Sequence, residues 1–308
     1  MNPSNNIVIY HRADFDGIFS REVAKRLLDR DAQYIGWDYG DPIPVIPPGM
    51  NLYMIDISVE ELMGYPGLTW IDHHKSAINK YPDTIEGVRI DGVAACRLAW
   101  QWFLNEDVMD LDKSDFERRL VNEPLAVRLA GEYDVWDKRD PWADLLQHGL
   151  RGCEPDFDGL LNEGPNSRVY LESLVDAGRY VMHASREGQA YLMREGSFDL
   201  EFEGLRFLAI NAAVRNSAAF ESQVRLDHDG CLAFVWAPKK NSWKISLRGV
   251  PHKADFDLSV VAVKHGGGGH KQSCGFECAA LPFALAPKPL EIEGLTDGHT
   301  IYAGKGGV

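Results

Sequence analysis

The chain has 308 residues, of which 45% are apolar and 25% charged, and its net charge is −14 from 32 Lys and Arg against 46 Asp and Glu. This composition excludes long disorder, and the length allows a sizeable core and two domains. So acidic a chain is poorly suited to bind long duplex nucleic acid, because that affinity comes mainly from Lys and Arg that neutralise phosphates. Binding of a short anionic substrate is compatible with this charge if cations supply the counter-charge.

The five cysteines form no Cys-x-x-Cys pair, and the N-terminus is polar, uncharged and leads straight into a strand. No apolar run reaches the roughly 18 residues that a membrane helix needs. We therefore expect reduced cysteines, a cytoplasmic protein, no signal peptide and no membrane association. A homodimer is left open.

In chain order, the first part alternates strands and helices, which indicates a doubly wound parallel sheet of the α/β class. Strands are expected at 7–10, 33–38, 51–55, 68–71 and 87–90. Helices are expected at 17–30, near 58–63, and at about 93–104, 114–130, 141–150 and 167–194. Asp16 stands near the expected N-cap of the first helix. The last helix is long enough to bridge two domains.

The pattern changes after Gly196 to that of a smaller α/β domain. We expect a hairpin within 199–211, a helix at 218–226, strands at 231–236, 243–247 and 273–279, a short helix at about 257–264, and a weakly patterned tail from 281. The domain boundary is expected near residue 190, which divides the chain into a domain of residues 1–190 and a domain of residues 191–308.

Metal-ligand side chains follow three of the expected strands. They are His11, Asp14, Asp16, Asp56, Asp72, His73 and His74. Ligands gather outside the carboxyl ends of strands in open α/β sheets. Carboxylates and imidazoles without a thiolate suit Mn²⁺, and less well Mg²⁺. Two such ions would share a bridging carboxylate and a bridging water, so the pattern predicts a two-metal phosphoesterase. Taken alone, Asp16 would suit a helix cap equally well.

In these motifs the chain resembles the DHH phosphoesterase superfamily, named for the triplet that stands here as Asp72-His73-His74. The segment from His11 to Gly17 resembles the first motif, Asp56 the second, and the segment from Gly131 to Asp137 the fourth. The resemblance covers nearly the whole chain. One departure is the loop between His11 and Asp14, which is one residue shorter than in many members.

The resemblance implies a role for each motif residue. One ion would be bound by His11, Asp14 and Asp56, and the other by Asp16, Asp56, His73 and Asp134. His74 would face the scissile phosphate, and Asp72 would orient the neighbouring imidazoles. Asp137 competes with Asp134 for the fourth motif, or is a surface partner of Arg139. Phe15 and Trp136 are expected in the core rather than stacked on a base.

The second domain carries a signature of its own. Arg248, Asp257 and the run Gly267-Gly268-Gly269-His270 stand in the order that resembles the substrate-binding domain DHHA1. Taken alone, a run of four glycines is most often a flexible loop. It also lets backbone N–H groups approach an anion, while Arg248 can hold a phosphate bidentately and His270 adds a donor. We expect Arg248, Gly267, Gly268, Gly269 and His270 to bind substrate. The resemblance weakly implies that Asn211 contacts substrate, and a turn residue suits it equally.

Together these features predict an enzyme with two Mn²⁺ ions, or Mg²⁺, that hydrolyses short oligonucleotides of the nanoRNA type to mononucleotides. A metal-bridging hydroxide would attack the phosphorus, in a cleft between the two domains. The alternatives are an enzyme that acts on 3′,5′-bisphosphonucleosides or on linear or cyclic dinucleotides, and a non-catalytic nucleotide-binding module. The hallmark of that module would be missing metal ligands, and the motifs above lack none.

Overall fold

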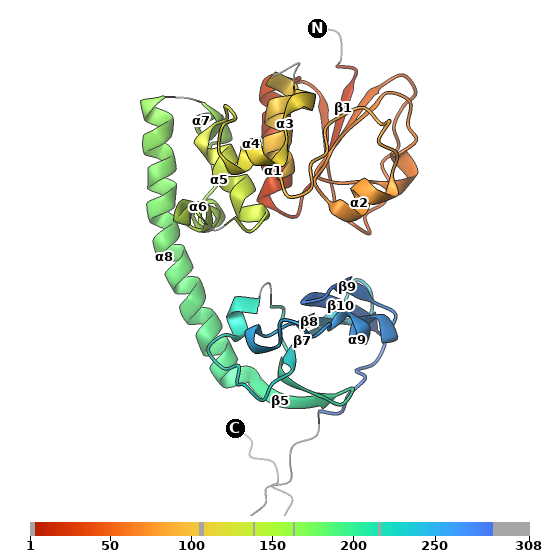
Figure 1. Cartoon of the computed structure of the whole chain (residues 1–308), viewed down its shortest axis with the longest axis vertical. Coiled ribbons are helices and arrows are strands. Elements are labelled where there is room, and N and C mark those ends of the chain that lie inside the picture. Colours follow the sequence, from red (N-terminus) through yellow and green to blue (C-terminus); the bar gives the residue numbers. More distant parts are fainter. Residues whose placement is uncertain (1–3, 105–107, 138, 163, 215–216, 286–308) are drawn as a thin grey trace, which may run out of the picture. The chain divides into compact units, whose positions relative to one another are not determined.

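The computed structural model describes residues 4–104, 108–137, 139–162, 164–214 and 217–285 (Figure 1). The chain divides into two compact units, Met1–Arg186 and Glu187–Val308. The division falls inside the long helix α8 (Pro165–Gly196), which belongs to both units. Most of the tail expected from residue 281 lies outside the described residues.

Unit 1 is built on a sheet whose described strands are all parallel. In the order in which they pair, they are β2 (Gln33–Trp37), β1 (Asn6–His11), β3 (Asn51–Ile55) and β4 (Leu68–Ile71). The chain steps from β1 to β2 on one side and then crosses to β3 on the other. This reversal is the switch point of a doubly wound sheet, where ligands bind outside the carboxyl ends of the strands. The expected fold class is confirmed.

Both faces of this sheet are covered, because its strands carry apolar residues at successive positions. Val8 packs with the helices on one face, and its neighbours Ile7 and Ile9 pack on the other. All three side chains are buried, and each contributes about 1.5–3 kcal/mol relative to an exposed position. Continuous apolar runs of this kind are typical of parallel sheets with two covered faces.

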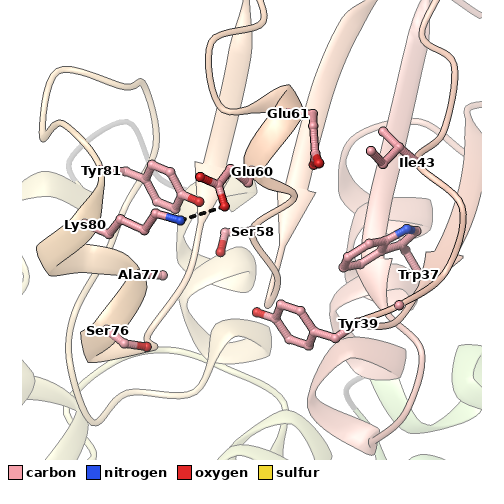
Figure 2. Close-up of a pocket in the computed structure, with 11 residues that line it drawn as sticks. Trp37, Tyr39, Ile43, Ser58, Glu60, Glu61, Ser76, Ala77, Lys80 and Tyr81 are labelled. Carbon is pink, nitrogen blue, oxygen red and sulfur yellow. Dashed lines mark ion pairs between the residues drawn. The ribbon is translucent and has the colours of Figure 1, made fainter. Parts of the chain in front are cut away.

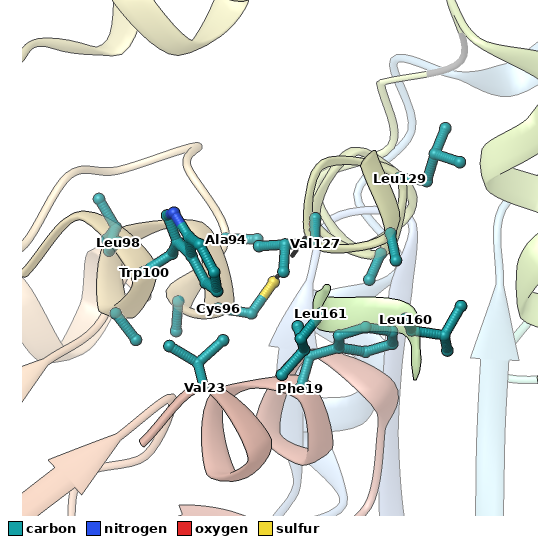
Figure 3. Packing of buried hydrophobic residues seen from close by; sticks show 14 of the residues in the cluster. Phe19, Val23, Ala94, Cys96, Leu98, Trp100, Val127, Leu129, Leu160 and Leu161 are labelled. Atoms are coloured by element: carbon teal, nitrogen blue, oxygen red, sulfur yellow. Dashed lines mark hydrogen bonds between the residues drawn. The ribbon is translucent and has the colours of Figure 1, made fainter. Parts of the chain in front are cut away.

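The helices of unit 1 lie on those two faces (Figure 1). They are α1 (Phe15–Leu27), η1 (Glu60–Leu62), α2 (Lys75–Lys80), α3 (Ala95–Leu104), η2 (Val108–Asp110), α4 (Lys113–Glu117), α5 (Leu125–Asp134), α6 (Pro141–Arg151) and α7 (Phe157–Leu161). Phe19 and Val23 of α1 pack with Leu98 of α3, Val127 of α5 and Leu160 of α7 (Figure 3). This cluster fixes α1 and α5, which carry candidate ligands, and α3, whose first N–H groups hold Asp16.

Two expectations for unit 1 are wrong. The helix expected at 114–130 is split into α4 and α5, because Arg119 takes a left-handed φ of 56° and Pro124 stands at the N-cap of α5. The strand expected at 87–90 is reduced to isolated bridges at Glu86 and Arg89. Gly87 between them has a φ of 123°, which breaks the extended backbone.

Unit 2 holds a mixed sheet. Its strands, in pairing order, are β5 (Ser197–Phe202), β6 (Leu205–Ile210), β7 (Gly230–Ala237), β8 (Ser242–Arg248), β10 (Ser273–Cys278) and β9 (Gly268–His270). Only β6 and β7 are parallel among these pairs of described strands. The remaining elements are η3 (Ser217–Phe220), η4 (Pro251–Lys253) and α9 (Ser259–Lys264). Phe207, Phe234 and Leu247 are fully buried at the centre of its core.

The hairpin expected around Glu203 and Gly204 is present, and both residues have the positive φ that its turn requires (54° and 74°). The helix expected at 218–226 is wrong, since only the short 3-10 helix η3 forms there. The glycine run is also more ordered than a flexible loop, because Gly268 and Gly269 belong to edge strand β9.

All five cysteines lie in the described residues and all are free. Within the same residues, no helix has both the length and the apolar character that a membrane crossing needs.

Candidate metal centre

The predicted ligands of unit 1 gather at the carboxyl edge of the sheet in two groups, which a third group of Asp56, His73 and His74 joins. In the first, one ligand atom each of His11, Asp14 and Asp56 lies within 4.8 Å of the others. In the second, the same holds for Asp16, His73 and Asp134. These groups follow from the topology, because His11 ends β1, Asp56 follows β3 and His73 follows β4.

Asp56 connects the two groups. Its Oδ2 lies 3.4 Å from Nδ1 of His11, and its Oδ1 lies 3.3 Å from Nε2 of His73. The residue is 2% exposed and takes a left-handed φ of 64°, while its N–H donates to the carbonyl of Ile71 at 2.9 Å. Strained backbone of this kind is retained where the surroundings fix it, often at functional sites. Each carboxylate oxygen of Asp56 therefore faces a different group.

Asp14 and Asp16 both stand in the ligand groups, but the helix cap expected of Asp16 belongs to Asp14. Asp14, rather than Asp16, caps α1, because its carboxylate accepts the N–H of Gly17 at 3.0 Å. Asp16 is buried and accepts the N–H groups of Ala95 and Cys96, at 2.8 and 2.7 Å, where α3 begins. Helix N-termini stabilise negative charge, so α3 holds this carboxylate at the site.

Gly17 is required at the start of α1 by lack of space. A Cβ atom at this position would lie 1.8 Å from the carbonyl oxygen of His11. Any side chain here would push α1 away from the end of β1. The glycine of the first motif therefore keeps Asp14 and Asp16 next to His11.

Asp134 ends α5, and a buried ion-pair network fixes that end. Glu132 is fully buried and pairs with Arg119 at 2.7 Å and with Arg128 at 2.9 Å. Oδ2 of Asp134 then lies 3.3 Å from Nε2 of His73. Asp137 pairs with Arg139 at 2.8 Å and does not belong to the ligand groups, which agrees with its interpretation as a surface partner of Arg139.

The two aromatic residues that were expected in the core beside this site, Phe15 and Trp136, differ in their burial. Phe15 is partly buried and packs against the core cluster of α1, α3 and α5. Trp136 is 72% exposed, so its expected place in the core is wrong. Its left-handed φ of 57° follows the end of α5 and turns the side chain away from the core.

Asp72 and His74 form a second layer around the ligands. Oδ1 of Asp72 accepts the N–H of His73 and of His74, at 2.7 and 3.0 Å, and lies 2.7 Å from Nδ1 of His74. Oδ2 accepts the indole N–H of Trp70 at 3.1 Å. Burial raises the pKa of Asp72, but the hydrogen bond to His74 and its charge outweigh burial and lower it. The carboxylate thus fixes the ring of His74, whose side chain is 42% exposed.

The residues present fit divalent cations. Nδ1 of His11 and Oδ2 of Asp56 are buried and make no hydrogen bond of normal geometry within the described structure, although that nitrogen lies 2.8 Å from Oδ2 of Asp14 and 3.4 Å from Oδ2 of Asp56. Burial and the charge of Asp16 raise the pKa of Asp134 to about 7. Burial and the charge of Asp56 likewise raise the pKa of Asp16. Crowded carboxylates thus hold protons that a cation would displace. Oxygen and imidazole ligands without thiolate suit Mn²⁺ and less well Mg²⁺.

One residue near the site was not expected. Oδ1 of Asp38 lies 3.5 Å from Nε2 of His11, on the side of the ring opposite Asp14. Asp38 directly follows β2, so the rule that picked out Asp56 would also have found it.

In unit 2, the predicted substrate residues are only partly brought together. Arg248 and the glycines 266–269 line a cavity of about 550 Å³, and Arg248 donates a hydrogen bond to the hydroxyl of Ser273. His270 is exposed and is not among the described residues that line this cavity. The N–H of Gly267 already donates to the carbonyl of Ala262 at 2.9 Å, so Gly268 and Gly269 are the better candidates for an anion.

The chain matches no protein-family model and no curated protein sequence. Among solved structures it is similar to the pGpG-specific phosphodiesterase PggH from Vibrio cholerae, at 13% identity over 89% of this chain and 93% of that chain, with a TM-score of 0.44. It is similar to RecJ in complex with Mn²⁺ from Thermus thermophilus, at 14% identity over 89% of this chain and 49% of that chain, with a TM-score of 0.47.

A third similar structure is the DHH domain of a member of the s1p family of ribosomal proteins, at 14% identity over 90% of this chain and 83% of that chain, with a TM-score of 0.49. Its name includes the superfamily that the sequence motifs resemble. The assignment of the metal centre rests on the side-chain geometry described above rather than on these similarities.

Proposed function

We propose that the protein is a DHH-superfamily phosphoesterase that hydrolyses phosphodiester bonds in short oligonucleotides with the aid of two divalent ions. The observation that carries the proposal is the position of Asp56, whose two oxygens face His11 on one side and His73 on the other. A carboxylate placed between two ligand groups is the arrangement that two-metal phosphoesterases use.

The ligands of the two groups would each hold one ion. His11, Asp14 and Asp56 form one set, and Asp16, His73 and Asp134 form the other. Asp56 would be shared, because its Oδ1 lies 3.3 Å from Nε2 of His73. When bound, the two ions would supply an activated water and neutralise the charge on the phosphate. Mn²⁺ is the proposed metal, because carboxylates and imidazoles are mixed.

The chain's own side chains would orient the phosphate. The hydrogen bond from Nδ1 of His74 to Asp72 leaves Nε2 available on the exposed side of the ring. That hydrogen bond raises the pKa of His74 although burial lowers it, so the ring retains its proton more readily and can donate to a phosphate oxygen. Asp72 acts through His74 and is a positioning residue.

The proposed substrate is a nucleotide chain of a few residues. The net charge of −14 disfavours long polymers, and Arg248 in unit 2 supplies a cation for one phosphate. Gly268, Gly269 and His270 stay proposed as further contacts. The free state of all five cysteines agrees with a reducing, cytoplasmic location.

Hydrolysis of bis-p-nitrophenyl phosphate by the purified protein tests the reaction. We expect turnover with Mn²⁺ and none after a chelator removes the metal. Product analysis on 5′-labelled di- to decanucleotides, with a bisphosphonucleoside and a cyclic dinucleotide in parallel, then tests the substrate class. No hydrolysis of any of these by the metal-loaded protein would overturn the proposal.

A further inference from the structure

A pocket of about 400 Å³ lies beside the candidate metal centre and belongs to none of the ligand groups (Figure 2). Trp37 and Tyr39 stand on one side of it and Tyr81 on the other, and the carboxylate of Glu61 points into the space between them (Figure 2). Its volume is within the range of small-molecule sites. Its aromatic walls suit a planar ligand.

Tyr39 joins this pocket to the metal centre. Its ring lies 6.5 Å from the ring of His11 and 5.6 Å from that of Trp37, in edge contacts with both. Ser58 lines the same pocket and stands two residues after Asp56. The other wall begins at Ser76, two residues after His74. A nucleotide whose phosphate lies at the metal centre would therefore have this pocket within reach of its base.

The charge of the pocket selects the part of a nucleotide that it can hold. Glu60 is paired with Lys80 at 2.8 Å. Glu61 makes no ion pair or hydrogen bond with any described residue. An unpaired carboxylate repels phosphate, in contrast to the cavity of unit 2, which Arg248 and Lys244 line. The pocket therefore suits a neutral base that carries hydrogen-bond donors.

We propose that this pocket binds a guanine base, with Tyr39 stacked on the ring and Glu61 accepting its hydrogen bonds. This inference rests on the proposed function for the position of the phosphate. The Watson–Crick edge of guanine offers two adjacent N–H donors, which a carboxylate can accept together as a charge-assisted pair. The corresponding edge of adenine offers one donor beside a ring nitrogen that the carboxylate repels. The pocket should thus prefer guanine to adenine.

Binding of guanosine and adenosine to the metal-free protein, measured by calorimetry in the presence of a chelator, tests the pocket without phosphate or catalysis. We expect guanosine to bind about tenfold more tightly than adenosine, the discrimination typical of one bidentate pair. Glu61→Gln should abolish that preference, because an amide presents one acceptor and one donor. Tyr39→Ala should weaken both nucleosides about tenfold or more, since stacking serves either base.

Glu86→Gln is the matched control, because Glu86 is exposed, lies in unit 1 and does not line the pocket. It should keep the preference of the unchanged protein. Equal binding of the two nucleosides, no measurable binding of either, or a preference that survives Glu61→Gln would each overturn the inference.

Turnover separates this inference from the proposed function. With Mn²⁺, the unchanged protein should show a higher kcat/KM for pGpG than for pApA, and Glu61→Gln should reduce that ratio. Hydrolysis of bis-p-nitrophenyl phosphate without any preference between the dinucleotides would leave the enzyme standing and refute the guanine pocket. A guanosine preference without hydrolysis of any phosphodiester would refute the enzyme and leave the pocket standing.

Discussion

Oδ1 of Asp72 lies 2.7 Å from Nδ1 of His74 and accepts the backbone N–H groups of both His73 and His74. One buried carboxylate therefore fixes both the turn and the ring that would face the phosphate. Removing its charge tests the positioning role without removing the ring.

Asp72→Asn should lower kcat on bis-p-nitrophenyl phosphate about 10- to 100-fold, as the loss of an orienting partner typically does. The hydrogen bond to Asp72 raises the pKa of His74, so its loss should lower that pKa and move the alkaline limb of the pH–rate profile to lower pH. Asp91→Asn is the surface control, since Asp91 is 56% exposed. A variant with an unshifted profile would contradict the assigned role.

Asp56→Asn should lower kcat at least about 10³-fold, because both ligand groups lose the carboxylate that they share. The lost charge would have stabilised the transition state by several kcal/mol. The fold should survive in metal-free protein, since Asn tolerates the left-handed φ of 64°. Circular dichroism and initial rates with saturating Mn²⁺ measure the two effects. Near-normal turnover would show that Asp56 does not bridge.

Saturating Mn²⁺ should raise the unfolding temperature of unit 1. Ligand at 100 times its Kd stabilises a folded protein by about 2.7 kcal/mol, which corresponds to roughly 5 to 10 °C for a unit of this size. Calorimetry with Mn²⁺ and with a chelator measures the shift, and Asp56→Asn should lose most of it. An equal shift in that variant would place the metal elsewhere.

The affinity for Mn²⁺ should rise with pH between pH 6 and 8. Burial and the charge of Asp16 raise the pKa of Asp134 to about 7, so below that pH the metal must displace a proton. By the same shift, Asp134 alone contributes stability to the metal-free protein that is fully present below about pH 4 and is lost as pH rises to about 7. Titration calorimetry in two buffers of different ionisation enthalpy should detect proton release at pH 6.5, and its absence would refute the assignment.

Arg248→Ala should raise KM for short oligonucleotides more than it lowers kcat, if the guanidinium only anchors a phosphate. Bis-p-nitrophenyl phosphate, which lacks a second phosphate, should be affected less. Arg194→Ala removes an exposed arginine of the same unit and serves as the control. Equal falls in kcat and kcat/KM would instead indicate a role in the transition state.

The sequence predicted the sheet of unit 1 and that most residues of the candidate metal centre lie together, because both follow from local patterns. Apolar runs marked β1, β3 and β4, and parallel strands bring the residues that follow them to one edge. Asp56, for example, was identified as a candidate ligand only from its position after the apolar run Leu52-Tyr53-Met54-Ile55. The same local rule would have identified Asp38.

The parts that were missed depend on distant contacts or on single backbone angles. Asp16 caps α3 through Ala95 and Cys96, 79 and 80 residues away, and no local pattern encodes that contact. The left-handed φ of Arg119 ends α4 at a residue whose type does not favour it. Trp136 likewise has a left-handed φ and is exposed, although an aromatic side chain of this size is typical of a core.

The contact of Asp16 with the start of α3 also sets an order of events when the chain is synthesised. Asp16 leaves the ribosome long before Ala95 and Cys96, and until they emerge its carboxylate lacks the two N–H groups that hold it. Asp134 emerges later still. All residues of the first ligand group therefore precede residue 57, whereas the second group is complete only with α5. A chain cut between residues 57 and 94 would therefore keep the side chains of the first group but lack Asp134 and the N–H groups of α3 that hold Asp16.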